Sequence, residues 1–491
     1  MEKRMPTPNE QQWRLDYQQA RLEEVLPGGV VRCHLSPRTC TLKEGQNGFC
    51  GVRGNRGGHL ITMNYGKSVH ATEETIETEA VNHFSPGERI LSMGNIGCMM
   101  NCSYCHNWKT SQAKHVSDRD VHRYTPEDVV AIAKRHNIRM LSWTYNDPVV
   151  WHEFVIDTAR LARQNGIMNL YKSAFYITPE AVEELIPEMD IFSVSIKSMD
   201  PEYYRKYTKG RLEPVLRATE QAYKSGKHVE FSTLMITDLS DNEETARQVT
   251  EWALTKLDAT VPMHFVRFHP DYRMTDRTRT PIPRLLRCRE VAVEMGMQHV
   301  YLGNVYDTPF SDTKCNGCGQ LLVSRYGLNA VVRGLDDRGH CVACGRDAHF
   351  KMRGAPPASA STEQPRGAIT TKRFEWHGDV RSLHVQAKNT GPAATSLYVR
   401  RLLRNGAEAR WRIVPFIPGE SVRFIVAKSF PDEVGCEVAI GGGLSTNLHE
   451  VFDRAHFPTV AVEEVGTMRN DYSPLPLYNG PAAQDQVERE A

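Results

Sequence analysis

Short apolar runs alternate with amphipathic stretches from Arg89 to Asn304. A strand of a parallel sheet is buried on both faces and reads as a short apolar run, whereas a covering helix carries an apolar stripe at helical spacing. The alternation therefore predicts repeated βα units and a parallel sheet. We expect its strands at residues 90–93, 140–143, 168–171, 191–196, 229–234, 264–268 and 300–302.

The stretches between these runs begin like helices. Thr125 precedes Pro126 and Thr178 precedes Pro179, which places threonine at the helix N-cap and proline in the first turn. Roughly six or seven βα units suit an α/β fold of the partial (β/α)6 barrel type, whose chemistry lies at the carboxyl ends of the strands. Several polar candidates follow the expected strands directly.

The two flanks of this region have other patterns. Residues 12–26 show helical apolar spacing and end at Pro27-Gly28-Gly29, which predicts an N-terminal helix. Residues 382–387 and 422–427 alternate with period two, which predicts a small antiparallel β-sandwich. We expect an N-terminal helix and cysteine-containing module at 1–80, the barrel at 81–310, a ribbon at 311–353, a flexible linker at 354–366, the sandwich at 367–465 and a disordered tail at 466–491.

Length and composition agree with a globular protein of several domains. The chain has 491 residues, 40% of them hydrophobic and 24% charged, and its length suggests about two to three domains. A net charge of +1 gives no general reason to expect nucleic acid or a membrane surface as partner. Because the 12 cysteines come without a signal-peptide pattern, we expect a cytoplasmic protein whose clustered cysteines bind metal.

Three cysteines at CxxxCxxC spacing follow the first expected strand: Cys98, Cys102 and Cys105, with Tyr104 directly before the third. An ordinary four-iron cluster takes four cysteine thiolates. A loop with three leaves one iron open to a chelator, as a cluster needs if it is to bind and cleave S-adenosylmethionine (SAM). The alternatives are an incidental cysteine loop or a zinc site with His106 as the fourth ligand.

A second cysteine pattern, CxxC followed by CxxC, lies beyond the last expected strand. Each pair is followed by a glycine, which relieves the left-handed backbone after the second cysteine. Four thiolates close a site, so zinc there would be structural. An auxiliary iron–sulfur cluster and the absence of any metal are the alternatives. The residues concerned are Cys315, Cys318, Cys341 and Cys344.

The CxxxCxxC loop resembles the signature of the radical SAM superfamily, in which an aromatic residue precedes the third cysteine. Residues 32–53 resemble the N-terminal module of the AmmeMemoRadiSam-system radical SAM enzymes, which are relatives of the pyruvate formate-lyase activating enzymes. Ser36 stands where some members have cysteine. The segment is either a second metal site, with His34 as a possible ligand, or a substrate-gating cap, or a small Gly-rich fold with buried free thiols at Cys33, Cys40 and Cys50.

The resemblance implies a radical SAM enzyme of the glycyl-radical-activating type. A [4Fe-4S] cluster on the loop cysteines would cleave SAM reductively to a 5′-deoxyadenosyl radical, which abstracts hydrogen from a small-molecule, peptide or protein substrate. An electron donor such as flavodoxin or ferredoxin is then expected. A non-catalytic metal-binding scaffold with a structural zinc ribbon is the alternative.

The resemblance also assigns contacts to SAM at the ends of two strands. Asn146 and Asp147 match a motif that receives the SAM amino group, with Asp147 replacing a longer glutamate. An Asx-Pro turn that caps the next helix is the structural alternative. Ser195 and Lys197 match a motif that contacts SAM, with Ser195 in place of an acidic residue. Lys197 would pair with the SAM carboxylate or be a solvated lysine.

Arg267 and His269 lie in a stretch that closely resembles a motif of the same enzymes. Strand alternation predicts that the two side chains share a face. His269 matches a histidine that contacts SAM, although a histidine in a barrel is often a core residue. Residues 172–174 read Lys-Ser-Ala where relatives carry a TNG-like turn, which suggests a changed substrate.

Overall fold

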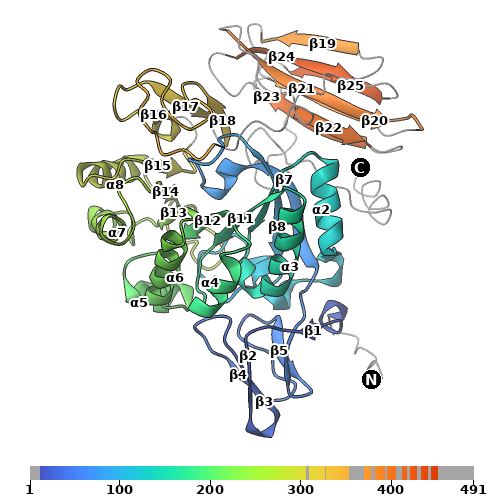
Figure 1. Cartoon of the computed structure of the whole chain (residues 1–491), viewed down its shortest axis with the longest axis vertical. Coiled ribbons are helices and arrows are strands. Elements are labelled where there is room, and N and C mark those ends of the chain that lie inside the picture. The colour runs from blue at the N-terminus through green and yellow to red at the C-terminus, as the bar shows by residue number, and fades with distance from the viewer. Residues whose placement is uncertain are drawn as a thin grey trace.

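A nine-stranded sheet forms the centre of the molecule (Figure 1). The computed structural model describes residues 11–305, 309–326 and 328–352, and, further on, 370–376, 382–392, 395–404, 412–416, 421–427, 433–440 and 444–451. All seven expected strands are confirmed, and they pair in parallel in the order of the chain. They are β8 (Arg89–Asn95), β10 (Met140–Thr144), β11 (Met168–Ser173), β12 (Ile191–Ser195), β13 (His228–Met235), β14 (Met263–Arg267) and β15 (Val300–Gly303).

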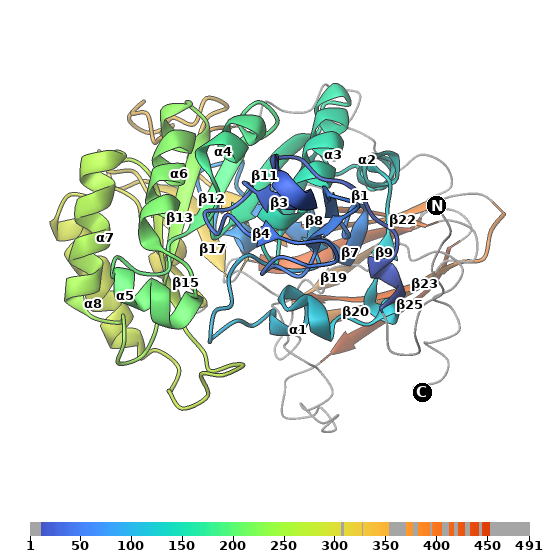
Figure 2. The same ribbon diagram turned by 90° about the horizontal axis from the view of Figure 1, so that it is seen from below.

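Two antiparallel strands extend this sheet beyond β8. They are β7 (Lys67–Thr75) and β9 (His122–Arg123), so the sheet begins before the expected boundary at residue 81. The helices between parallel strands ring the outer face of the sheet (Figure 2). The longer ones are α2 (Pro126–Arg135), α3 (His152–Gln164), α4 (Pro179–Leu185), α6 (Leu212–Lys224), α7 (Glu243–Lys256) and α8 (Ile282–Glu294).

The predicted helix starts are confirmed. Thr125 Oγ1 accepts a hydrogen bond from the Asp128 amide at 3.1 Å, and the Asp128 carboxylate accepts one from the Thr125 amide, which completes a capping box. Thr178 Oγ1 accepts from the Ala181 amide at 3.4 Å. Both helices pack apolar faces against the sheet, where Val129 and Val182 are fully buried.

The expected helix at residues 12–26 is wrong. That segment holds a short 3-10 turn at Gln12–Arg14 and then extended chain. Gly28 and Gly29 adopt φ of +76° and +71°, so Pro27-Gly28-Gly29 makes the turn of a hairpin. Pairing with the next strand satisfies the backbone of residues 23–26, and this non-local partner is invisible to helical spacing.

The N-terminal module consists of two small antiparallel sheets near the carboxyl ends of the central strands (Figures 1 and 2). The first has the order β1-β6-β5 and the second β2-β3-β4. The strands are β1 (Gln18–Gln19), β2 (Glu23–Leu26), β3 (Val30–Cys33), β4 (Thr41–Leu42), β5 (Arg53–Arg56) and β6 (His59–Thr62).

A three-stranded antiparallel ribbon lies at the opposite end of the sheet: β16 (Thr313–Lys314), β17 (Leu321–Tyr326) and β18 (Asn329–Val332) (Figure 1). Arg325 of β17 donates through Nη2 to the Asn82 carbonyl at 2.6 Å. The amides of Asn82 and His83 in turn donate to Glu230, near the start of β13. The ribbon therefore faces the amino ends of the parallel strands.

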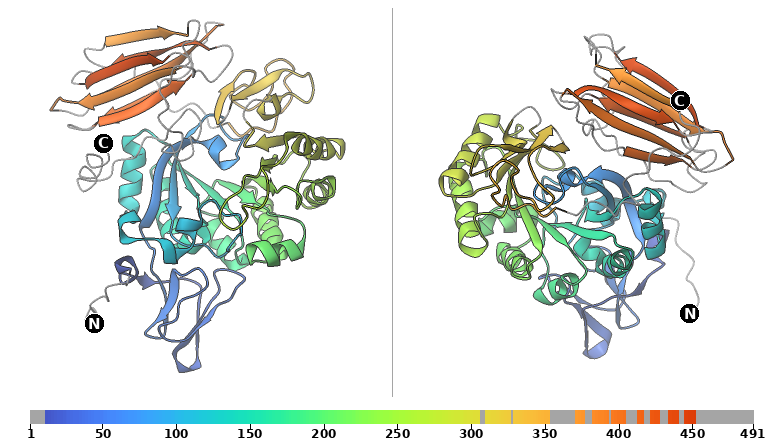
Figure 3. Two further views of the ribbon diagram at one scale, coloured as in Figure 1. Left: turned by 180° about the vertical axis from the view of Figure 1, so that it is seen from behind. Right: turned by 45° about the horizontal axis from the view of Figure 1, so that its top comes forward.

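The C-terminal region folds into two antiparallel sheets (Figure 3). Leu383 of one sheet packs in a shared core with Leu397 and Cys436 of the other, which supports the sandwich interpretation. The expected linker at 354–366 and tail at 466–491 lie outside the described residues. The strands are β19 (Thr370–Glu375), β24 (Glu433–Ile440), β21 (Thr395–Leu403) and β22 (Arg412–Phe416) in the first sheet, and β23 (Ser421–Ala427), β20 (Ser382–Asn389) and β25 (Leu444–Val451) in the second.

Among the residues that the structure describes, no helix combines the length and apolar character needed to cross a bilayer.

Candidate active site

The CxxxCxxC loop leaves the carboxyl end of β8 and is held from both sides. The Asn101 amide donates to the Thr208 carbonyl at 3.0 Å, and the Ser103 amide donates to the Tyr207 carbonyl at 2.9 Å. Both carbonyls belong to a π-helical turn, Tyr204–Thr208. On the other side, Gly97 adopts φ +89°, and a Cβ there would lie 2.9 Å from a carbonyl oxygen of the N-terminal module. These contacts fix the position of the loop.

The three thiols of this loop are half-buried. Thiolates around one tetrahedral zinc stand about 3.8 Å apart, since Zn–S bonds are about 2.3 Å long. In the described chain, the potential ligand groups whose donor atoms all lie within 4.8 Å of one another do not include Cys98, Cys102 and Cys105. The loop thiols therefore do not converge on one point as the four ribbon thiols do.

Burial and two nearby charged groups, Lys197 and Asp147, act on the pKa values of the loop thiols. Burial raises the pKa of Cys102 to about 12, and the nearby Lys197 ammonium acts in the opposite direction. Burial also raises the pKa of Cys98 well above its ordinary value, and the Asp147 carboxylate adds to the shift. Tyr104 is buried, and its ring centroid lies 6.3 Å from that of Tyr203. Such thiols ionise when a metal takes the place of the proton.

Asn146 and Asp147 follow β10 through Tyr145, which has φ +69°. The Asn146 side chain donates to the Asn95 carbonyl and accepts from Thr110 Oγ1 at 3.0 Å. It thereby ties the end of β10 to the end of β8 and to the short helix α1 (Trp108–Ser111) that follows the cysteine loop.

Asp147 is buried and accepts three hydrogen bonds. They come from Ser173 Oγ and the Ala174 amide, both at 2.8 Å, and from the Val149 amide at 3.2 Å. Burial raises its pKa to about 6 in spite of these donors. The Asx-Pro turn is thus confirmed, because Asp147 caps the 3-10 helix that begins at Pro148. Its SAM contact stays a prediction.

Two lysines lie at the next strands: Lys172 within β11 near its carboxyl end, and Lys197 just after β12. Lys172 Nζ donates to Ser193 Oγ at 3.0 Å and to Ser232 Oγ at 3.3 Å. Burial lowers its pKa to about 8, with Glu79 opposing the shift. Ser195 Oγ lies 3.4 Å from Ser232 Oγ. Lys172 therefore points between the strands β11, β12 and β13.

Lys197 is anchored through its backbone, since its amide donates to the Tyr204 hydroxyl at 2.9 Å. Its ammonium acts electrostatically on both Cys102 and Cys105. It also lies near enough to Lys172 to oppose that residue's charge. A cation beside the cluster loop could receive an anionic group of a ligand bound there.

The shared strand face predicted for Arg267 and His269 is not formed. β14 ends at Arg267, so strand alternation does not reach His269, and Arg267 Nε donates to the Thr280 carbonyl at 2.8 Å. His269 stacks on His106, with ring centroids 3.7 Å apart. Donor atoms of His106, His269 and Asp271 lie within 4.8 Å of one another. His106 therefore groups with those two residues and not with the loop thiols.

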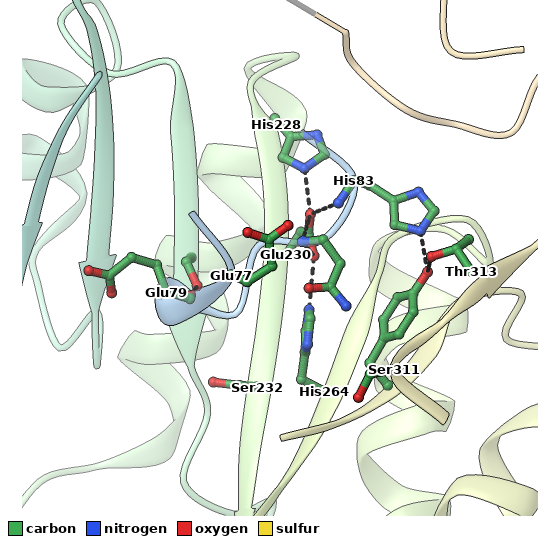
Figure 4. Close-up of polar contacts among 12 residues, drawn as sticks. Glu77, Glu79, His83, His228, Glu230, Ser232, His264, Ser311 and Thr313 are labelled. Atoms are coloured by element: carbon green, nitrogen blue, oxygen red, sulfur yellow. Dashed lines mark hydrogen bonds and ion pairs between the residues drawn. The ribbon is translucent and has the colours of Figure 1, made fainter. Parts of the chain in front are cut away.

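A buried polar network inside the sheet was not anticipated from the sequence, and its Glu230 part lies near the amino ends of β13 and β14 (Figure 4). Glu230 accepts from His228 Nε2 at 2.9 Å and from His264 Nε2 at 2.8 Å, besides the amides of residues 82 and 83. Burial alone would raise the Glu230 pKa, but these donors hold it well below its ordinary value. Glu79 accepts from Ser142 and Thr144 hydroxyls, each at 2.8 Å.

One signal could have revealed this network. Glu230 and His264 interrupt two otherwise apolar runs, and a charged residue inside a strand that is buried on both faces requires partners. The network fills the interior between the strands and the segment that precedes β8.

The four cysteines of the ribbon form a closed group. Sγ of Cys315 lies 3.6 Å from that of Cys344, and Sγ of Cys318 lies 3.6 Å from that of Cys341. These separations are close to the edge of a zinc–thiolate tetrahedron, about 3.8 Å. The Gly317 amide donates to Cys315 Sγ at 3.4 Å. Burial opposes ionisation of Cys315, but backbone donors of this kind prevail and lower its pKa to about 6.

Comparison with known proteins settles the family. A family model described as the Radical SAM superfamily matches residues 95–253, which include the cysteine loop and the strands up to β13. The chain belongs to the radical SAM superfamily. Such membership implies a [4Fe-4S] cluster and SAM as cofactors. The three-thiol loop fits that cluster by the chemistry of its donors.

Individual relatives of this radical SAM chain include proteins with and without an assigned activity. An uncharacterized protein of Methanocaldococcus jannaschii is 37% identical over 330 residues, covering 67% of this chain and 97% of the relative. A pyruvate formate-lyase-activating enzyme of Streptococcus mutans is 26% identical over 170 residues, covering 32% of this chain and 64% of the relative. A solved domain of the corresponding enzyme of Bacteroides vulgatus has a TM-score of 0.30 at 16% identity, covering 33% of this chain and 98% of that domain.

Proposed function

We propose that Cys98, Cys102 and Cys105 hold the [4Fe-4S] cluster of a radical SAM enzyme that removes a hydrogen atom from its substrate. The observation that carries this proposal is the three-thiol loop at the carboxyl end of β8, whose sulfur atoms are not among the groups of the described chain that converge within 4.8 Å. When bound, such a cluster supplies the electron that cleaves SAM to a 5′-deoxyadenosyl radical. The chain itself orients the ligands and limits the access of water.

The polar groups around the loop suit the zwitterionic end of SAM. Lys197 would pair with the SAM carboxylate, because its ammonium acts on two of the loop thiols. Asn146 and Asp147 would receive the amino group from the opposite side, with Asp147 acting on Cys98. Asp147 already accepts three hydrogen bonds, so Asn146 is the more available acceptor.

Four further residues complete the proposed cofactor site. Tyr104 supports the loop from the buried side, and Ser195 offers a hydroxyl at the end of β12. His269 offers a ring face next to the loop through its stack on His106. Arg267 acts indirectly, since its guanidinium holds the carbonyl of Thr280.

The substrate belongs to one of three classes: a small molecule, a peptide or a glycine of a partner protein. Similarity to an enzyme named as pyruvate formate-lyase-activating supports the last of these. Two features support a specialised role instead. Lys172 stands where relatives carry a TNG-like turn and points into the interior, and the C-terminal sheets add a further unit at the periphery. A flavodoxin or ferredoxin would supply the electron.

Reductive cleavage of SAM tests the proposal. Anaerobically reconstituted full-length protein, reduced with dithionite, should release 5′-deoxyadenosine, which chromatography detects. Cys102→Ala should abolish this release, whereas Cys436→Ala, in the C-terminal sheets, should leave it intact. Equal loss in both variants, or a cluster-loaded protein that releases no 5′-deoxyadenosine with any reductant, would contradict the assignment.

We also propose that the ribbon binds structural zinc. All four sulfur atoms converge, and no ligand position stays open once four thiolates bind. Elemental analysis of protein purified without added iron should find zinc, and Cys318→Ser should remove it. Iron in place of zinc at this site would indicate an auxiliary cluster instead.

A further inference from the structure

Three thiols outside the cluster loop line one small pocket in the N-terminal module: Cys33, Cys40 and Cys50. Cys33 ends β3 and Cys40 precedes β4, and the Cys33 amide donates to the Cys40 carbonyl at 3.0 Å. Cys50 enters from the turn before β5. Ser36 lines the same pocket. The hairpin and the turn thus bring together three thiols and one hydroxyl.

A buried arginine donor faces this group. Arg53 lines the pocket, is 1% exposed and interacts electrostatically with Cys33 and Cys50. Its Nη1 pairs with Glu153 at 2.8 Å and its Nη2 donates to the Arg21 carbonyl at 2.5 Å. Its Nε has no hydrogen-bond partner in the described part of the chain. Buried donors are almost always satisfied, so this N–H points to a ligand with an acceptor.

A second arginine connects the pocket to the SAM cluster loop. Arg38 interacts electrostatically with Cys40, Cys50 and Cys98. Its Nε donates to the Met99 carbonyl at 2.5 Å, and Met99 itself lines the pocket. Glu153 balances the charge of Arg53, so it is Arg38 that adds positive charge next to the thiols, which favours a thiolate-ligated, anionic group.

We propose that Cys33, Cys40 and Cys50 bind a second iron–sulfur cluster, with Ser36 at its fourth corner and Arg53 Nε donating to it. The three sulfur atoms do not all lie within 4.8 Å of one another in the described chain, unlike those of the ribbon, so they do not form a closed tetrahedral group of the ribbon's kind. Hydrogen bonds to cluster sulfur are a normal part of such sites.

His34 is not the fourth ligand. Its Nε2 lies 2.7 Å from Glu24 Oε2, and it does not line the pocket. Ser36 is therefore the remaining oxygen donor next to the thiols. A serine corner leaves that iron more weakly held than the three bound to cysteine.

Iron counting on the full-length, anaerobically reconstituted protein tests the inference. The variant Cys33→Ala/Cys40→Ala/Cys50→Ala should lose about four iron atoms relative to the unchanged chain and keep the four at the other loop. The variant Cys98→Ala/Cys102→Ala/Cys105→Ala should lose about four as well and retain an electron paramagnetic resonance signal after reduction. The ribbon is common to all three proteins, so its metal cancels in each difference.

Two controls separate metal loss from misfolding. Cys288→Ala removes a buried thiol outside all three cysteine groups and should change no iron count. Ser36→Cys should keep the iron of the second site and alter its resonance signal, because a fourth thiolate replaces an oxygen ligand.

The inference is overturned if the Cys33/Cys40/Cys50 variant keeps the full iron count, if it loses zinc instead of iron, or if Ser36→Cys leaves the signal unchanged. SAM cleavage by the loop cluster is measured separately. Release of 5′-deoxyadenosine therefore tests the function proposed above, whereas the iron count tests only the second cluster.

Discussion

Burial of Asp147 removes water from around its carboxylate and disfavours the charged form. Three donors hold the carboxylate in place, yet its pKa rises from 3.8 to about 6. A carboxyl group with a raised folded-state pKa stabilises the fold below its unfolded pKa, and that contribution is lost as pH rises through the folded value. The relevant window here is therefore pH 4 to 6.

We expect the free energy of unfolding of the cluster-free protein to lose up to about 3 kcal/mol from this group between pH 4 and 6. Asp147→Asn cannot titrate, so the difference between variant and unchanged chain should shift with pH in favour of the variant. Urea denaturation at several pH values measures this. A difference that stays constant from pH 4 to 7 would contradict the burial of a titrating carboxyl group.

Lys197 is the residue on which SAM affinity should depend most. Removing one charge-assisted hydrogen bond costs about 1.5–3 kcal/mol, so Lys197→Ala should weaken SAM binding roughly 10- to 100-fold. Isothermal titration measures the affinity, and iron counting should show an unchanged cluster. Lys206→Ala, on the π-helical turn nearby, should change neither. Loss of iron in Lys197→Ala would instead make this lysine a support of the loop.

At the scale of elements, the cysteine loop depends on how closely β8 approaches the N-terminal module. Gly97 has φ +89°, and a Cβ would meet the Cys50 carbonyl at 2.9 Å and Val52 at 3.0 Å. Gly166, after α3, has φ +69°, but a Cβ there would meet nothing within 4 Å. The two glycines share a left-handed backbone conformation, but only at Gly97 would an added Cβ collide with neighbouring atoms.

Gly97→Ala should therefore destabilise the protein by more than the roughly 1 kcal/mol that the left-handed conformation alone costs at Gly166→Ala. It should also reduce the iron retained after reconstitution, because the loop must shift. Denaturant midpoints and iron content of the two variants provide the comparison. Equal effects on both quantities would show that the close approach has no influence on the loop.

The elements differ in how far local pattern predicts them. The seven parallel strands are mostly buried, so each carries its own apolar signal, and the caps at Thr125 and Thr178 mark two of the helices between them. Residues 12–26 carry no comparable signal, because their structure depends on a partner strand across Pro27-Gly28-Gly29. Residues 18 and 19 pair even further away, with residues 61 and 62.

The candidate site shows the same limit. Residue type and spacing were enough to pick out the cysteine groups as candidate ligands, because the side chain alone determines whether a residue can bind a metal. The partners of individual side chains could not be predicted in this way, because Glu230 contacts Asn82 and His264, which come from distant parts of the chain. Strand alternation was expected to put Arg267 and His269 on one face, but β14 ends at Arg267.

At the scale of the whole molecule, the ribbon and the N-terminal module occupy opposite ends of the central sheet (Figure 1). Cys318→Ser should remove the ribbon's metal and lower the melting temperature by roughly 5 °C or more. Release of 5′-deoxyadenosine should be largely unchanged, because the cysteine loop lies at the other end. Calorimetry and the cleavage assay report the two quantities. Loss of cleavage at an unchanged melting temperature would place the ribbon in the reaction.

The contacts of the N-terminal module impose an order on the protein's biosynthesis. Its hairpins are anchored by residues made much later: Glu153 pairs with Arg53, Thr178 donates to the His34 carbonyl, and Arg211 donates to that of Pro37. The ribosome must therefore release more than half of the central sheet before these hairpins can dock. Until then Cys33, Cys40 and Cys50, the first thiols to be synthesised, lack their folded surroundings. Iron delivered at that stage would meet an incompletely formed site.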